Sequence, residues 1–304
     1  MSAPDDRPPV GEYALLGLLA LLWGSSYLFA KAAVAEIPPL TVAAARVSIA
    51  AVLLLAVASA GRERWPRGGR IWGMLLVQAV FNSIGAWSIL AWSQRHIDAA
   101  LASVLNSTAP IFVFFMTLAV TRHEATSWRR FAGALLGLAG VVLIVGLDAA
   151  RGLDVGVLGA AGALFSAFLY GCAAIYGRRF SDLSPAATAA GTMVWASVVL
   201  LPAPLAFERP WTLRPSLEAL AALAALGVFC TGAALLLYFR LIRTLGSLGV
   251  ASQAYLRAGV GAGLAVLILG ERLRAETLFG VALALIGVAC INLPAKAGGR
   301  PRGQ

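Results

Sequence analysis

The sequence predicts an all-α membrane protein in which ten transmembrane helices form two inverted repeats of five. Apolar residues fill 60% of the 304 positions and charged residues only 12%, and the mean hydropathy is +0.84. A soluble domain is about half apolar and a quarter charged. The apolar residues fall in runs of about twenty, and each is long enough to cross a hydrocarbon core of ~30 Å as a helix. Short connections leave no room for a separate soluble domain.

Ten apolar runs lie between clusters of charged residues or prolines, and each is predicted to be one span. An unsatisfied peptide group costs several kcal/mol in hydrocarbon, so only helices or a closed barrel can cross it. The runs lack the alternation of apolar and polar residues that a barrel requires. In chain order, the predicted spans are 13–35, 40–60, 71–92, 99–120, 127–147, 153–176, 185–207, 216–239, 246–269 and 277–293.

Basic residues alternate in density from one connection to the next. If the N-terminus is cytoplasmic, the inner segments hold fifteen of the 24 basic residues and the outer segments seven, with two inside spans. This pattern follows the positive-inside rule and predicts a multi-pass protein of the cell inner membrane with both termini cytoplasmic. The net charge of +10 is therefore a topology signal, and we expect no nucleic-acid partner.

Polar and aromatic residues inside the first half of the chain are candidates for substrate contact, because polar groups in a bilayer usually face a cavity. In the first span, Trp23 and Tyr27 share a helix face. Between them, Gly24 permits close helix approach or local unwinding. In the fourth span, Pro110 leaves the Asn106 carbonyl without its helical donor and predicts either a cavity feature with a hinge or an ordinary bend. The third span contributes Gln78, Asn82 and Trp87.

Two arginines lie inside predicted spans. Arg257 is near the middle of the ninth span, where a central arginine costs roughly 2.5–3.5 kcal/mol to insert. It is either a cavity residue that pairs with an anionic group of the substrate or a structural arginine satisfied by helix carbonyls or a neighbouring ring. Arg46 is closer to the end of the second span, so it has either a gate or structural role, or contacts substrate. The other candidates of the second half are Tyr170, Tyr176, Tyr238, Ser252, Gln253 and Tyr255.

The residues that are missing also restrict the function. None of the fourteen acidic residues falls in the middle of a predicted span, so a proton relay through a buried carboxylate is unsupported. The sequence contains no ATP-binding motif and no cluster of catalytic or metal-ligating side chains, and the three cysteines lie apart within spans. We therefore expect no enzymatic activity, no cofactor and no metal site.

The two halves of the chain resemble each other. Glu124 and Glu271 are 147 positions apart, and the same offset relates the glycine pairs Gly133/Gly140 and Gly280/Gly287. Since each half holds five spans, the second half must start from the opposite side of the membrane. That is the inverted repeat of transporters that alternate access around a midplane site. Recurrence of similar Gly/Leu-rich helices by composition alone is the alternative.

These features together resemble the drug/metabolite transporter superfamily, and within it the EamA-type exporters, over about residues 16–293. The motifs that carry the resemblance are 22–25 (LWGS), Arg46, 108–110 (TAP) through Glu124, and 254–256 (AYL) through 269–273 (LGERL). Two departures are Arg257-Ala258, where the family usually has proline at the second position, and the extra residue in the turn 121–124. The resemblance implies a ten-helix transporter and leaves its substrate class open.

The sequence as a whole favours a secondary transporter that exports or exchanges small metabolites such as amino acids or other small carboxylates. We expect a cytoplasmic tail over residues 1–12, repeats over 13–148 and 153–293, and a second cytoplasmic tail over 294–304. The substrate is expected between the repeats, near Arg257, with the lipid bilayer as the other partner and a monomer or homodimer as the assembly. The alternative is a lipid-carrier flippase or a structural membrane protein.

Overall fold

The computed structural model describes residues 10–61, 65–120, 128–149, 155–180, 182–238, 240–241, 244, 253–270 and 275–292. Within these ranges the chain is helical or connects helices, and it contains no strand. Glu124, Ser252 and Glu271, and most of both predicted tails, lie outside the described residues.

The first repeat contains five helical crossings. Two of them are interrupted, because the third continues through a π-helical turn and the fourth breaks at Ser107 and Thr108. In chain order the elements are α1 (Val10–Glu36), α2 (Pro39–Ala60), α3 (Gly69–Ala79), η1 (Val80–Gly85), α4 (Ala86–Ser93), α5 (Ala99–Asn106), α6 (Ala109–Val120) and α7 (Trp128–Ala149).

The second repeat follows the same plan, and its third crossing again contains a π-helical turn, η4. Its elements are α8 (Val155–Gly177), η2 (Arg178–Phe180), α9 (Pro185–Leu200), α10 (Pro202–Phe207), η3 (Pro210–Thr212), α11 (Leu217–Gly227), η4 (Val228–Ala233), a helical stretch over 234–238, α13 (Gln253–Leu269) and α14 (Ala275–Asn292).

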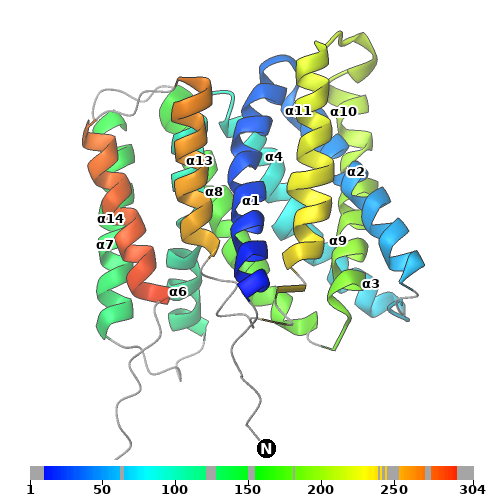
Figure 1. The fold of residues 1–304 in the computed structure, drawn as a ribbon, viewed down its shortest axis with the longest axis horizontal. Helices are drawn as coiled ribbons and strands as arrows, with labels where there is room; N and C mark the ends of the chain where they lie inside the picture. The colour runs from blue at the N-terminus through cyan, green and yellow to red at the C-terminus, as the bar shows by residue number, and fades with distance from the viewer. Residues whose placement is uncertain are drawn as a thin grey trace, which may run out of the picture.

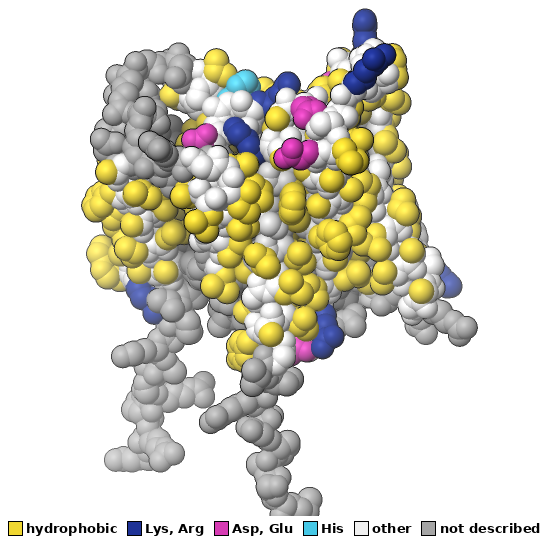
Figure 2. Space-filling view, turned by 45° about the horizontal axis from the view of Figure 1, so that its top comes forward, with side chains coloured by type: hydrophobic (Ala, Val, Ile, Leu, Met, Phe, Trp, Pro, Cys, Tyr) yellow, Lys and Arg dark blue, Asp and Glu magenta, His cyan; other side chains and the backbone are white. Residues whose placement is uncertain are grey.

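The helices match the ten predicted spans. Seven are long and apolar enough to cross a membrane, and three shorter apolar stretches, Phe131–Gly140, Gly259–Leu269 and Leu278–Gly287, belong to α7, α13 and α14. Figure 2 shows a broad band of hydrophobic side chains on the visible face, with basic and acidic side chains gathered toward its two edges. The all-helical membrane fold expected from the sequence is thereby confirmed.

The packing of the helices is pseudo-symmetric between the repeats. α1 packs on α13 and α11, and its counterpart α8 packs in the same way on α5/α6 and on η1/α4. α2 packs on its own counterpart α9, and α7 on α14, at opposite ends of the molecule (Figure 1). α1 begins and α14 ends on the same side of the helix layer (Figure 1), as ten crossings require. The five crossings before α8 place its start on the other side. The repeats are therefore inverted.

The α7–α14 contact is built on the glycine pairs that the sequence repeat contains. A Cβ atom added to Gly140 would lie 2.6 Å from the Gly280 carbonyl oxygen, and one added to Gly287 would lie 2.5 Å from the Gly133 carbonyl oxygen. Backbone thus touches backbone in a reciprocal arrangement. In lipid, helices associate through this kind of close van der Waals packing, because lipid tails are as apolar as the side chains and the hydrophobic effect does not drive helices together.

Two carboxylate groups join the repeats near the C-terminal end of α1. Glu36 of α1 accepts hydrogen bonds from the backbone and hydroxyl groups of Ser216, both at 2.7 Å, at the start of α11. Glu208, after α10, accepts from the backbone N–H groups of Leu40 at 3.0 Å and Thr41 at 2.7 Å, at the start of α2. Each carboxylate satisfies donors that a helix N-terminus otherwise leaves unpaired, so these contacts fix the ends of α1 and α2.

We expect Gly140→Ala to lower the free energy of unfolding by about 1–3 kcal/mol, the usual cost of overpacking. The new methyl group would lie 2.5 Å from the Ala284 backbone nitrogen, and backbone can yield only if the two helices separate. Thermal unfolding in detergent, followed by tryptophan fluorescence, measures the effect. Gly73→Ala is the matched control, because nothing lies within 4 Å of the added atom. Equal melting temperatures for the two variants would contradict the proposed contact.

Candidate functional site

A cavity of about 230 Å³ lies between the two repeats. The first repeat contributes its wall from α1, α2, η1, α4 and α5, and the second from α8, η4, the stretch 234–238 and α13. The residues that line it are Trp23, Ser26, Tyr27, Arg46, Asn82, Trp87, Leu90, Asn106, Tyr170, Cys230, Thr231, Leu235, Tyr238 and Arg257.

Interruptions in three helices shape this cavity. Asn82 lies in η1, and Cys230 and Thr231 lie in η4, where a π-helical turn departs from the α-helical hydrogen-bond pattern. Such turns are frequent at functional sites. Asn106 is the last residue of α5, next to the break that precedes Pro110. Each break leaves backbone polar groups outside the α-helical hydrogen-bond pattern. At membrane depth, such groups are tolerated only in the protein interior or beside a cavity.

Arg46 is held rigidly in the cavity wall. Its side chain is only 8% exposed, its Nε donates to the Thr231 hydroxyl at 2.7 Å, and its guanidinium lies 4.0 Å from the centre of the Trp87 ring. Thr231 in turn donates to the Leu226 carbonyl at 2.8 Å, and the Trp87 indole donates to the Tyr170 hydroxyl. The arginine therefore faces the cavity and does not extend to the membrane surface.

Arg257 and Asn106 also face the cavity, but with unpaired atoms. The Nε of Arg257 is buried and has no hydrogen-bond partner in the described part of the chain. The same holds for the Oδ1 of Asn106, whose side chain is 1% exposed. Buried polar groups in proteins are nearly always paired, so an unpaired donor and an unpaired acceptor on residues of this lining are unusual.

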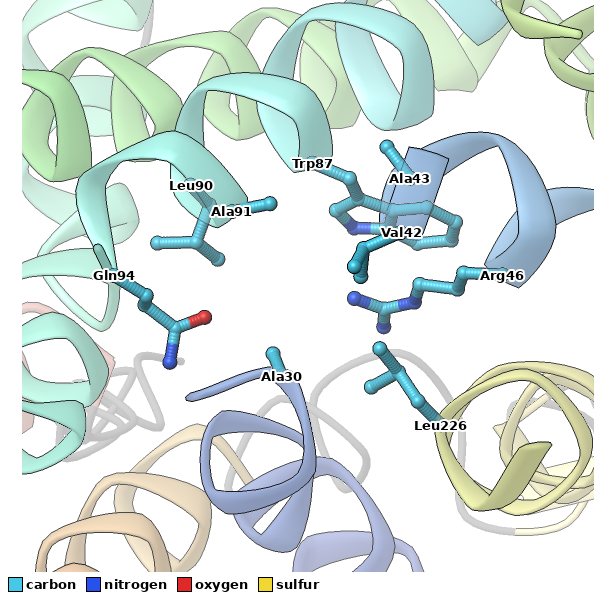
Figure 3. A pocket seen from close by; sticks show the side chains of 9 residues that line it. All are labelled: Ala30, Val42, Ala43, Arg46, Trp87, Leu90, Ala91, Gln94 and Leu226. Atoms are coloured by element: carbon cyan, nitrogen blue, oxygen red, sulfur yellow. The ribbon is translucent and has the colours of Figure 1, made fainter. Parts of the chain in front are cut away.

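A second, much smaller pocket adjoins the cavity. Its volume is about 10 Å³, which is near the lower limit for a single water molecule. Arg46, Trp87 and Leu90 line both spaces and form the partition between them. Figure 3 shows the Arg46 guanidinium and the Gln94 amide facing this pocket from opposite sides. The Nε2 of Gln94 donates to the Tyr27 carbonyl at 2.8 Å, so the pocket is narrow and held in place.

Aromatic rings form the apolar part of the cavity wall. Trp23 and Tyr238 contact each other with ring centroids 5.3 Å apart, and Tyr27 is buried at 3% exposure. Rings of this kind bind an apolar body and offer polar tips to a ligand. The described lining contains no Asp or Glu, and the described residues hold no group of three or more side chains suited to a metal ion.

The structure brings most of the predicted site residues together. Eight predicted binding residues line the cavity, as does the predicted gate residue Arg46: Trp23, Tyr27, Asn82, Trp87, Asn106, Tyr170, Tyr238 and Arg257. Gln78 lies elsewhere, because its Nε2 donates to the Ala173 carbonyl at 3.2 Å. Tyr176 contacts the Phe81 ring. Gly24 packs against Val260, 2.6 Å from an added Cβ. The side chains of Gln253 and Tyr255 lie outside the described residues.

Five lining residues escaped the sequence analysis: Ser26, Leu90, Cys230, Thr231 and Leu235. The two π-helical turns are 148 positions apart, and their sequences, 81–85 (FNSIG) and 229–232 (FCTG), are similar. Aligning the halves of the chain here would have placed Cys230 opposite the cavity residue Asn82, and Thr231 opposite its neighbour Ser83. Cys230, one of the three cysteines that the sequence places apart within spans, borders the cavity.

Comparison with known proteins gives one family. A model of the EamA-like transporter family matches residues 12–146 and 157–293. The uncharacterized inner membrane transporter YedA of Escherichia coli (strain K12) is 26% identical over 279 residues, or 91% of this chain and 87% of YedA. An uncharacterized transporter of Archaeoglobus fulgidus is 28% identical, covering 91% of this chain and 95% of its own. A crystal structure with 21% identity and a TM-score of 0.63 covers 92% of this chain and 96% of its own, and shows the same fold.

Thr231→Val is expected to lower the free energy of unfolding by about 1.5–3 kcal/mol, the contribution of a hydrogen bond to a charged group. Valine keeps the shape of threonine but leaves the buried Nε of Arg46 without its acceptor. Thermal unfolding of the purified protein measures the loss. Thr231→Ser retains the hydroxyl group and should stay close to the wild type; a valine variant of wild-type stability would show that Thr231 does not hold Arg46.

Proposed function

Because the chain belongs to the EamA-like transporter family, we propose that it is a secondary transporter of small carboxylate metabolites, a class that includes amino acids. It would export or exchange them across the cell inner membrane, with both termini in the cytoplasm. The apolar helices and the inner-membrane designation of the similar YedA support this location. The repeats over 13–148 and 153–293 would move against each other around the central cavity.

The observation that carries the proposal is the presence of two guanidinium groups in one membrane-embedded cavity whose described lining has no carboxylate. An uncompensated charge in a low-dielectric interior is strongly unfavourable. An anionic substrate removes that penalty, and the planar fork of arginine matches a carboxylate. Arg46, fixed by Thr231 and Trp87, provides a preorganised contact. Arg257, whose Nε is unpaired, closes on the substrate from the second repeat.

The partition formed by Arg46, Trp87 and Leu90 supports an alternating-access mechanism. Beyond it, on the side where α1 ends, Lys31 donates to the carbonyl groups of Gln94 at 2.8 Å and Ile97 at 2.7 Å. A substrate could pass this region only after these contacts open. Arg46 would thereby combine substrate contact with the gate role considered from the sequence. A bound carboxylate would compete with Thr231 and Trp87 for its guanidinium group.

Substrate or ion gradients would drive the movement. No acidic residue falls in the middle of a predicted span, so exchange or facilitated diffusion is favoured over a carboxylate proton relay. The turn at Ser107 and Thr108, just before Pro110, and the close approach of α1 to α13 at Gly24 are the positions at which helices would bend or slide.

Arg257→Ala is expected to reduce uptake of carboxylates into proteoliposomes by at least about tenfold, which corresponds to the loss of one charge-assisted contact of about 1.4 kcal/mol or more. Arg257→Lys keeps the charge but loses the planar fork, so we expect an intermediate rate. Arg214→Ala changes the net charge equally at an exposed position outside the cavity and serves as the control. Unchanged transport of every substrate by Arg257→Ala would remove this residue from the site.

A further inference from the structure

The charge of the cavity points to a narrower substrate class. We infer that the site selects small organic acids carrying a neutral hydroxyl group and discriminates against amino acids of the same carbon skeleton. The inference rests on the proposed function, because it concerns the same cavity. It depends on three observations: the sign of the charges, an unpaired acceptor, and a tryptophan face that a guanidinium group already covers.

The first observation is that every charged side chain in the described lining is positive. Arg46 and Arg257 both border the cavity, without an Asp or Glu beside them. The Glu12–Arg240 ion pair, at 2.8 Å, ties the beginning of α1 to the far end of the stretch that follows η4, away from these two arginines. A zwitterionic amino acid leaves the charge of the site unchanged and places its ammonium group beside two guanidinium groups. An acid without an amino group lowers that charge with each carboxylate it brings.

The second observation is the Oδ1 of Asn106. This atom is buried and accepts no hydrogen bond in the described part of the chain, and the side chain is 1% exposed. Because an unmade hydrogen bond is expensive in a buried site, a ligand that donates to this oxygen gains affinity. A hydroxyl group on the carbon next to a carboxylate donates without adding a positive charge. Ammonium also donates, but only together with the repulsion described above.

The third observation concerns the aromatic walls, because a free aromatic face attracts ammonium through cation–π contacts. The face of Trp87 is already covered by the Arg46 guanidinium at 4.0 Å. Trp23 is in contact with the Tyr238 ring. The hydroxyl group of Tyr170 accepts from the Trp87 indole and is turned toward that residue. The Trp87 face that Arg46 covers is therefore closed to ammonium, and the remaining aromatic surface of the lining is suited to the apolar body of a substrate.

Uptake of matched pairs into proteoliposomes at pH 7 tests the inference without any mutation. Malate and aspartate share a four-carbon skeleton and differ in hydroxyl against ammonium, and 3-phenyllactate and phenylalanine form a second, larger pair. We expect the hydroxy acid of at least one pair to be carried at least about tenfold faster than its amino acid. Comparable or faster uptake of both amino acids would overturn the inference.

Variants of Asn106 locate the discrimination at this residue. Asn106→Leu removes the acceptor, so the preference for malate over succinate, which lacks the hydroxyl group, should disappear. Asn106→Asp introduces a negative charge that can pair with ammonium, and it should lower the malate-to-aspartate ratio by about tenfold. A leucine variant that keeps the wild-type preference for malate would exclude Asn106 as the acceptor. If the aspartate variant does not fold, the leucine variant and the substrate pairs measured on the wild type still test the inference.

The outcomes separate the two proposals. If no acid and no amino acid is carried, the proposed function fails and the inference fails with it. If the wild type carries amino acids as well as hydroxy acids, and Arg257→Ala abolishes both, the transporter proposal holds and only the narrower substrate class is wrong.

Discussion

The buried guanidinium of Arg46 is the constraint around which the centre of this protein is organised. A charge at this depth is tolerated only with hydrogen-bond partners and a polarizable neighbour. Thr231 supplies the acceptor at 2.7 Å, and Trp87 supplies the ring face at 4.0 Å. These residues come from α2, η4 and α4, so a single cation joins three helices and both repeats. Because its partners are neutral, the positive charge remains available to an anion.

The π-helical turns show how the repeated architecture makes this arrangement possible. η1 and η4 occupy equivalent positions in the third crossing of each repeat, and both border the cavity through Asn82 and Thr231. An uninterrupted α-helix satisfies its whole backbone internally, whereas a π-helical turn departs from this hydrogen-bond pattern, as is frequent at functional sites. Thr231 combines the two roles, because it donates to the Leu226 carbonyl in its own helix while it accepts from Arg46.

The α7–α14 pair is closely packed, whereas the helices at the centre of the molecule enclose the cavity. At the α7–α14 pair, glycines bring the backbones together until no methyl group fits, and this contact is suited to remain fixed. Around the cavity, the side chains of Trp23, Trp87 and Tyr170 border an open space between the repeats, while α1 still packs on α13 and α4 on α8. The partition at Arg46, Trp87 and Leu90 is held by side-chain hydrogen bonds between helices, and the Lys31 contacts to loop carbonyl groups lie beyond it. Under the proposed mechanism, this partition would rearrange while the glycine contact stays in place.

The sequence by itself determined the ten membrane helices, their two halves and most of the cavity residues. Hydropathy fixes which segments enter lipid, and a polar residue within a span must face protein or water; hence Asn82, Asn106, Arg46 and Arg257 could be selected without coordinates. Only the tertiary structure decided which of them meet. Gln78 is polar and lies four positions before Asn82 in the same span, yet its side chain donates to the Ala173 carbonyl group. The hydrogen bond between Arg46 and Thr231 joins residues 185 positions apart. Spacing along one helix defines a face, whereas the neighbour of that face depends on how all the helices pack together.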